Sequence, residues 1–200
     1  MVTVSKKQDN KNRLLDIGVA LLTEKGYHGT GIKEILDAAN IPKGSFYNYF
    51  PSKEVYGAEV IRHYIAPFIR QIEDDLANHD GDALAALETY FQRLIDDLQE
   101  NQYQGGCLLG NLLGEIGDTS DKCRSALAEA VNDYAVTLAT GLALAQRQGA
   151  LRRDLSSREM ADLLVNAWQG ALLRMKIEHS IQPLEQCVDS LLQGYFRSGN

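Results

Sequence analysis

Apolar residues recur at the spacing of an α-helix along most of this 200-residue chain. Leu14, Ile17, Gly18 and Leu21 lie on one stripe of a first predicted helix over residues 8–25, and Gly26 marks its end. The same pattern predicts further helices over residues 52–79 with a kink at Pro67, 84–101, 107–116, 120–147, 157–179 and 183–195. No segment has a convincing alternation of apolar and polar residues, so the sequence predicts an all-α fold.

Residues 28–53 have the pattern of two short helices joined by a turn and followed by a new helix. Thr30 is predicted to cap the first helix, because its hydroxyl can accept a hydrogen bond from an unpaired N–H of the first turn. Asn40-Ile41-Pro42 breaks that helix. Pro42 suits the start of the second helix, which is predicted to run to about Phe50, where Pro51 stops it.

The second of these helices has one apolar and one polar side. Phe46 and Phe50 are four residues apart and are predicted to anchor it in a core. The predicted outer surface consists of Lys43, Gly44, Ser45, Tyr47, Asn48 and Tyr49. Lysine pairs with phosphate, glycine allows close backbone approach, and the hydroxyl and amide groups can bind phosphates or base edges. The alternative is a small helical subdomain with an aromatic core, but burying both tyrosines would bury nearly every side of this helix.

The segments GTGIKEIL and PKGSFYNYFPSKE resemble the DNA-binding signature of the TetR family of bacterial repressors. The resemblance covers roughly residues 8–56, and the rest of the chain matches mainly in its helical plan. It implies a phosphate contact at Thr30 and a second contact with the DNA backbone from Lys53. It also implies a recognition helix for the major groove that carries Lys43, Gly44, Ser45, Tyr47, Asn48 and Tyr49.

The predicted organisation is an N-terminal three-helix, helix-turn-helix DNA-binding domain over residues 1–52 and a C-terminal helical domain over residues 53–200. The first domain is too small to be stable by itself, so it must pack on helices of the second domain. In the second, the helices over 157–179 and 183–195 are apolar on more than one side, so they are predicted to form a four-helix dimer interface. A homodimer would read a near-palindromic operator, and a small-molecule effector that favours another spacing would release it.

The net charge of −7 is unevenly distributed. Residues 1–53 contain eight Lys/Arg and five Asp/Glu, a net +3, whereas the rest contains twelve and twenty-two, a net −10. The basic end can meet phosphate while the acidic body is repelled by it. The first residues contain no apolar run of a signal peptide, and no segment approaches about 18 uninterrupted apolar residues, so we expect a cytoplasmic protein without a membrane partner.

Three cysteines, Cys107, Cys123 and Cys187, have no metal-ligand spacing and are an odd number. We therefore expect free thiols, with no metal site, cofactor or disulfide framework. If a helix begins at Gly105-Gly106, the Cys107 thiol lies near unpaired N–H groups that favour the thiolate. The alternative is that Cys107 is a small buried apolar residue.

The segments GGCLLGNLLGEIGDTSDKCR and AWQGALLRMKIEHSIQPLE resemble the TetR subgroup that responds to N-ethylmaleimide and other reactive electrophiles. This resemblance implies that Cys107 is the sensing cysteine. It implies that Lys176 lowers the pKa of the thiol as a nearby cation or reacts with an oxidised sulfur. Chlorinated oxidants, quinones and reactive aldehydes are all candidate effectors.

The leading hypothesis is a homodimeric DNA-binding repressor that a small effector releases, with Cys107 as the site of modification. A second hypothesis keeps the fold but has a reversible, non-covalent ligand and a buried Cys107. A cysteine-dependent enzyme is a remote alternative, and because no histidine lies in a recognisable motif we expect no enzyme. A sequence-independent DNA binder would show no preference for a palindrome.

Overall fold

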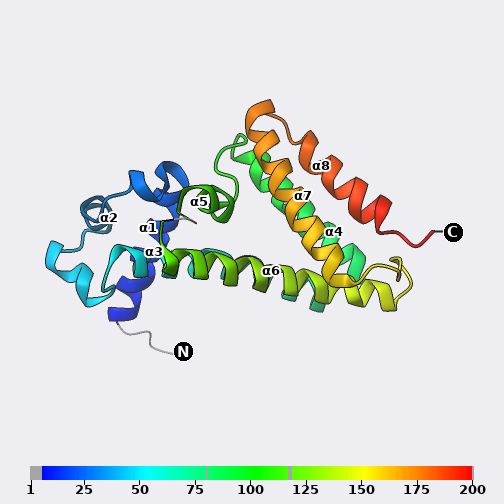
Figure 1. The fold of residues 1–200 in the computed structure, drawn as a ribbon, viewed down its shortest axis with the longest axis horizontal. Helices are drawn as coiled ribbons and strands as arrows, with labels where there is room; N and C mark the ends of the chain where they lie inside the picture. Colours follow the sequence, from blue (N-terminus) through cyan, green and yellow to red (C-terminus); the bar gives the residue numbers. More distant parts are fainter. Residues whose placement is uncertain (1–5, 80, 117–118, 200) are drawn as a thin grey trace. The chain divides into compact units, whose positions relative to one another are not determined.

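The computed structural model describes residues 6–79, 81–116 and 119–199, and within these ranges the chain folds into helices and short connections without a strand (Figure 1). The elements are α1 (Lys6–Gly29), α2 (Ile32–Ala39), the 3-10 helix η1 (Lys43–Asn48), α3 (Lys53–Asn78), α4 (Ala83–Glu100), α5 (Leu108–Ile116), α6 (Asp121–Arg147), α7 (Ser157–Glu178), α8 (Gln182–Val188) and the π-helical segment η2 (Asp189–Tyr195). The all-α prediction is confirmed. None of the helices in the described ranges is both long and apolar enough to cross a membrane.

Most predicted helix boundaries agree with the structure to within a few residues. The helix that contains Pro67 continues through it, and the connection between the helices predicted over 52–79 and 84–101 includes Asp80, which lies outside the described residues. The short helix predicted over 107–116 ends at Ile116, and Gly117 and Asp118 after it also lie outside the described residues. Ser156 caps α7 in a reciprocal arrangement, because it accepts from the Glu159 N–H while the Glu159 carboxylate accepts from the Ser156 N–H.

The helices form two compact units that divide the chain differently from the predicted boundary at residue 52. Unit 1 comprises Met1–Ala66 and Cys107–Ala130, and unit 2 comprises Pro67–Gly106 and Val131–Asn200. The first part of α3, the whole of α5 and the first part of α6 therefore belong with the three N-terminal elements. A bundle of about fifty residues buries too little apolar surface to be stable alone, which explains why these segments complete it.

The core of unit 1 is built on three aromatic rings. Phe46, Phe50 and Tyr56 are almost completely buried, and the Tyr56 ring centroid lies 5.4 and 4.9 Å from those of Phe46 and Phe50. The Tyr56 hydroxyl donates to the carbonyl oxygen of Leu14 at 2.7 Å. A methyl group at Gly18 would lie only 2.3 Å from the Tyr56 hydroxyl oxygen, so α1 approaches α3 through a glycine.

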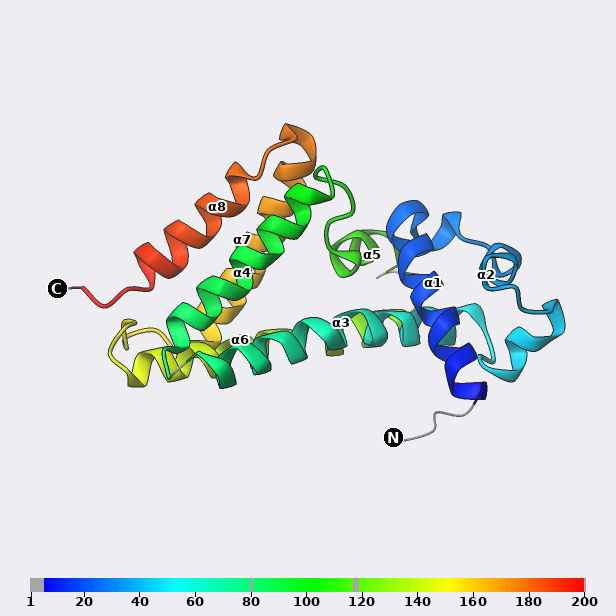
Figure 2. The ribbon, with the colours of Figure 1, turned by 180° about the vertical axis from the view of Figure 1, so that it is seen from behind.

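In unit 2, helices α4, α7 and α8 lie side by side in both views (Figure 2). The Phe91 and Trp168 rings join α4 to α7 with centroids 4.9 Å apart. The last helix starts at Gln182, one residue before the predicted start at Pro183, and it changes to π-helical geometry from Asp189 onward. Arg197 beyond it forms an antiparallel bridge with Leu151 in the connection between α6 and α7.

Candidate functional site

The predicted recognition helix is present as η1, held by the two aromatic anchors that the sequence identified. Phe46 and Phe50 are both 0% exposed, whereas Tyr47 is 62% exposed. Gly44 and Asn48 are also exposed, and nothing lies within 4 Å of a side chain built on Gly44. The side chain of Lys43 lies outside the described residues. The predicted core face of this element is confirmed, and Gly44, Tyr47 and Asn48 lie on the opposite, open side.

The helix type differs from the sequence prediction. We predicted a helix to about Phe50, whereas the structure has a 3-10 helix that ends at Asn48. Pro51 disfavours α geometry at the residue before it, so little room remains between the two prolines for an α-helix. In the tighter 3-10 turn Ser45 and Tyr49 become half-buried, and the Tyr49 hydroxyl accepts a hydrogen bond from the Asn10 side-chain amide of α1 at 3.3 Å.

The prediction that Thr30 caps α2 is wrong. Gly31 is the N-cap residue, and no side chain caps the first turn. Thr30 is instead 0% exposed, and its hydroxyl donates a hydrogen bond to the Gly26 carbonyl oxygen at 2.7 Å. The Leu21 carbonyl oxygen is a second acceptor, 3.3 Å from the same hydroxyl. The hydroxyl is bonded to the backbone where α1 is interrupted, so in this conformation it cannot contact a phosphate.

Lys53 is also turned toward the protein. Its ammonium donates to the Tyr27 carbonyl oxygen at 2.6 Å and lies 4.3 Å from the centroid of the Tyr27 ring. Partial burial lowers the pKa of Lys53, while the nearby Glu115 carboxylate opposes that shift. A phosphate contact from Lys53 would require the ammonium to leave Tyr27.

Cys107 directly precedes α5, which begins one residue later than the helix predicted over residues 107–116. Its carbonyl oxygen accepts the hydrogen bond of the Asn111 N–H at 3.1 Å, which places Cys107 at the N-cap position. Gly105 and Gly106 before it have φ of 86° and 82°, a backbone conformation that favours glycine. All three cysteines are free thiols, and Cys107 is half-buried whereas Cys123 and Cys187 are buried.

The two buried cysteines differ chemically from an accessible thiol. Burial raises the pKa of Cys187 to about 11, and it also raises the pKa of Cys123. Both therefore favour the protonated thiol, which is the less nucleophilic form.

Lys176 lies near the end of α7 in unit 2 and packs on Gly106. A methyl group built on Gly106 would lie 2.7 Å from Cε and 3.1 Å from Nζ of Lys176. The absence of a side chain at Gly106 therefore makes room for the Lys176 side chain beside the residue that precedes Cys107.

Sequence reasoning missed Glu115 of α5. Its two carboxylate oxygens accept hydrogen bonds from the backbone N–H groups of Tyr27 and His28, at 2.8 and 2.6 Å. These partners are 88 and 87 residues away along the chain, so no local pattern points to them. The one feature of the sequence that could have pointed to this contact is an acidic residue in a mostly apolar, glycine-containing helix.

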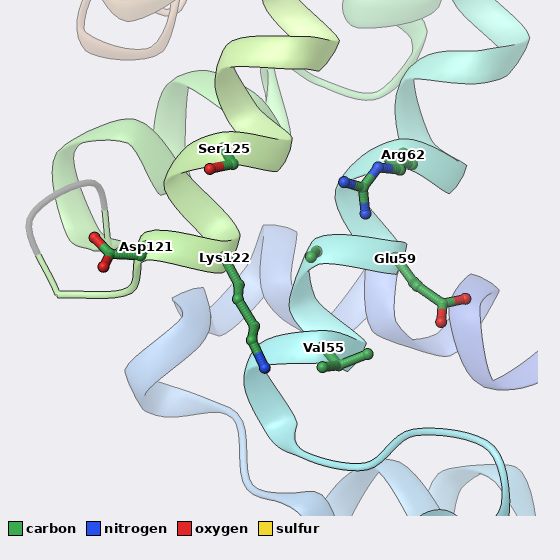
Figure 3. Close-up of a pocket in the computed structure, with 7 residues that line it drawn as sticks. Val55, Glu59, Arg62, Asp121, Lys122 and Ser125 are labelled. Atoms are coloured by element: carbon green, nitrogen blue, oxygen red, sulfur yellow. The ribbon is translucent and has the colours of Figure 1, made fainter.

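A groove of about 430 Å³ lies between α3 and α6 of unit 1 (Figure 3). Figure 3 shows Lys122 extending from α6 toward Val55, while Glu59 points away from α6. Arg62 at its edge is paired with Glu129 at 2.7 Å. None of the predicted site residues lines this groove, and its charges are mixed, so it defines no ligand class.

The chain matches two family models. The model described as "Bacterial regulatory proteins, tetR family" matches residues 14–55, which include η1. The model described as "Tetracyclin repressor-like, C-terminal domain" matches residues 83–191. Together they cover elements of both units.

Individual proteins are similar over most of the chain. The transcriptional repressor DhaR of Mycobacterium sp. strain GP1 is 35% identical over 176 residues, which are 88% of this chain and 87% of DhaR. The repressor NemR of Escherichia coli K12 is 29% identical over 182 residues, 91% of this chain and 92% of NemR.

Solved structures agree with these sequence matches. The crystal structure of the reduced form of E. coli NemR has a TM-score of 0.84 and covers 96% of this chain and 98% of that chain. That of the regulatory protein TetR from Rhodobacter sphaeroides has a TM-score of 0.82 at 32% identity, with coverages of 91% and 96%. The predicted family is confirmed, and the similarity to NemR supports the predicted subgroup. The chain thus belongs to the TetR family and is a DNA-binding transcriptional regulator rather than an enzyme.

Proposed function

We propose that this regulator is a homodimeric, cytoplasmic repressor that binds a near-palindromic operator through η1 and is released when an electrophile or oxidant modifies Cys107. The observation that carries the proposal is the position of Cys107. It is the one cysteine that is not buried, and it starts α5 in the same compact unit as η1. Unpaired N–H groups at the start of a helix stabilise a neighbouring negative charge.

The chemistry of the proposed step is a conjugate addition. The Cys107 sulfur donates an electron pair to one alkene carbon of N-ethylmaleimide, and an S–C bond forms as the C=C π bond breaks. The other carbon takes a proton from water, so no oxidant is consumed. Lys176 is proposed as a second residue of the effector site, which is supported by its packing on Gly106, the residue bonded to Cys107.

The proposed DNA contacts come from Lys43, Gly44, Ser45, Tyr47, Asn48 and Tyr49. Their support is the exposure of Gly44, Tyr47 and Asn48 opposite the buried phenylalanines. Thr30 is not part of this proposed surface, and Lys53 joins it only if its ammonium turns away from Tyr27. Repression rather than activation is supported by DhaR and NemR, both described as repressors.

The homodimer is supported by apolar side chains on the outer side of α7. Leu173 and Ile177 are 60% and 81% exposed, and Leu163 on the same stripe is 41% exposed. Exposed apolar residues aligned along one helix indicate a surface that another chain covers. A second copy of α7 and α8 would complete the predicted four-helix interface.

A comparison of Cys107→Ser with wild type tests the proposal. An operator duplex is first selected from random DNA with the wild type, and its affinity is measured before and after treatment with N-ethylmaleimide. We expect the wild type to lose at least about tenfold in affinity and the Cys107→Ser variant to keep its affinity. Equal release of the variant would contradict a role for Cys107 and would favour a reversible ligand instead.

A further inference from the structure

Helix α1 is interrupted at Gly26, and the interruption is occupied by a side chain from α5. Gly26 has φ 72° and ψ 177°, and the helical turn restarts after it. Such a break leaves N–H groups without partners inside the helix. The Tyr27 N–H donates to Oε2 of Glu115 at 2.8 Å, and the His28 N–H donates to Oε1 at 2.6 Å. Both carboxylate oxygens therefore accept hydrogen bonds from consecutive backbone N–H groups, and such a pair of N–H groups binds anions strongly.

Gly26 is required for this contact in two ways. Its positive φ is a conformation that other residues adopt only with strain. A methyl group built on it would also lie 2.5 Å from Oε2 and 3.0 Å from Oε1 of Glu115. The carboxylate thus lies directly on the glycine, with no room for another side chain.

The same few residues are held by a hydrogen bond among themselves and by bonds to the other helices of unit 1. The Thr30 hydroxyl donates to the Gly26 carbonyl oxygen, and the Lys53 ammonium donates to that of Tyr27. Lys25, just before the break, forms an ion pair with Glu34 of α2. We call residues 25–30 the α1–α2 junction. Its position fixes where α2 begins, and the position of α2 in turn fixes η1.

Cys107 and Glu115 belong to the same short helical segment. Glu115 follows Cys107 by eight positions, a helical rise of about 12 Å. Leu108 and Leu112 between them are 0% exposed, so one side of α5 is anchored in the core along its length and we expect the helix to shift as a unit. A group added to the half-buried Cys107 thiol needs space at the start of α5, and a shift made there reaches Glu115.

We propose that Glu115 is the positioning residue that couples α5 to the DNA-binding helices. This inference rests on the proposed function, because it assigns the path by which modification of Cys107 reaches η1. With Cys107 unmodified, the carboxylate holds the Tyr27 and His28 N–H groups and fixes the α1–α2 junction. When α5 shifts, these two hydrogen bonds are lost and α2 and η1 leave the orientation that fits DNA.

Glu115→Gln tests the coupling with little change in size, because an amide offers one acceptor and turns a donor toward the second N–H. We expect the reduced variant to bind the selected operator at least about tenfold more weakly than wild type. Labelling with N-ethylmaleimide should then weaken it by a clearly smaller factor than it weakens wild type. Glu129→Gln, which removes an exposed carboxylate of α6 in the same unit, is the matched control and should behave as wild type.

Amide hydrogen exchange of the wild-type protein gives a second measurement, which does not depend on whether the Glu115→Gln variant folds. Labelling of Cys107 should speed exchange in the α1–α2 junction by about tenfold or more, in parallel with operator release. If labelled wild type keeps its operator, the sensing proposal fails and the coupling fails with it. If labelling releases wild type while junction exchange stays unchanged, or while Glu115→Gln binds and releases as wild type does, the coupling alone is overturned.

Discussion

Tyr47 projects into solvent from a helix whose neighbouring residue Phe46 is fully buried. The two rings meet edge to face with centroids 5.6 Å apart, but Tyr47 is 62% exposed, so its hydroxyl is available for DNA. We predict that Tyr47→Ala weakens operator binding by about tenfold or more, since a homodimer would make the contact twice. Anisotropy titrations measure the change, and circular dichroism with size-exclusion chromatography should show an intact fold and an unchanged oligomer. Full-strength binding would mean that this face of η1 does not contact DNA.

The three thiols should react in a definite order. Burial raises the pKa of Cys187 to about 11 and also raises that of Cys123, so both stay protonated near neutral pH. We predict that N-ethylmaleimide labels Cys107 first at about pH 7, and that labelling of Cys187 speeds up about tenfold per pH unit below its pKa. Peptide mass spectrometry over time gives the order. Labelling of Cys123 or Cys187 as fast as Cys107 at neutral pH would contradict the assignment of a single accessible thiol.

At the scale of elements, Gly18 decides how closely α1 approaches α3. Alanine is the better helix former by about 1 kcal/mol, yet its methyl group would lie 2.3 Å from the Tyr56 hydroxyl oxygen. We predict that Gly18→Ala destabilises the protein by about 1–3 kcal/mol, measured by urea unfolding. Gly114→Ala in α5 is the matched control, because its methyl group meets open space and should be neutral or stabilising. Equal effects of the two substitutions would show that helix propensity, not packing, governs Gly18.

The sequence predicted elements well where a local residue dictates them. Pro42 and Pro51 bound the predicted recognition helix, and the spacing of Phe46 and Phe50 identifies its buried side. The period of apolar residues cannot separate a six-residue 3-10 helix from a short α-helix, so the half-burial of Tyr49 was missed. Thr30 has the residue type of a helix cap, but the broken α1 competes for its hydroxyl.

Long-range partners were the part of the site that the sequence could not supply. Lys53 has the chemistry of a phosphate contact, yet in the fold it meets the Tyr27 carbonyl oxygen, 26 residues earlier. Glu115 meets N–H groups that become available only because Gly26 interrupts α1. Both contacts depend on which helices pack together, which a single sequence does not encode in any local pattern.

For the whole molecule, the division of charge favours one orientation on DNA. The first 53 residues carry a net +3 and the remainder a net −10, so the end that contains η1 is drawn to phosphate and the rest is repelled. A single short recognition helix reads few base pairs, and two copies are needed for a near-palindrome. Specific binding is therefore expected to depend on the proposed dimer.

The outer stripe of α7 provides a test of that dimer. We predict that Leu173→Lys combined with Ile177→Lys yields monomers, because two buried charges at a self-complementary surface repel each other across the two-fold axis. Sedimentation measures the mass, and operator binding should fall together with dimerisation. Val136→Lys, at an exposed apolar position of α6, is the control and should remain dimeric. A dimeric double variant would place the interface elsewhere.

The central claim is that modification of one thiol controls operator binding, and a protein with Cys107 as its sole cysteine tests it most directly. Cys123→Ser combined with Cys187→Ser leaves that thiol alone, and mass spectrometry can verify one N-ethylmaleimide per chain. We predict that operator affinity falls by at least about tenfold in proportion to the labelled fraction. Unchanged operator affinity at complete labelling would contradict the claim.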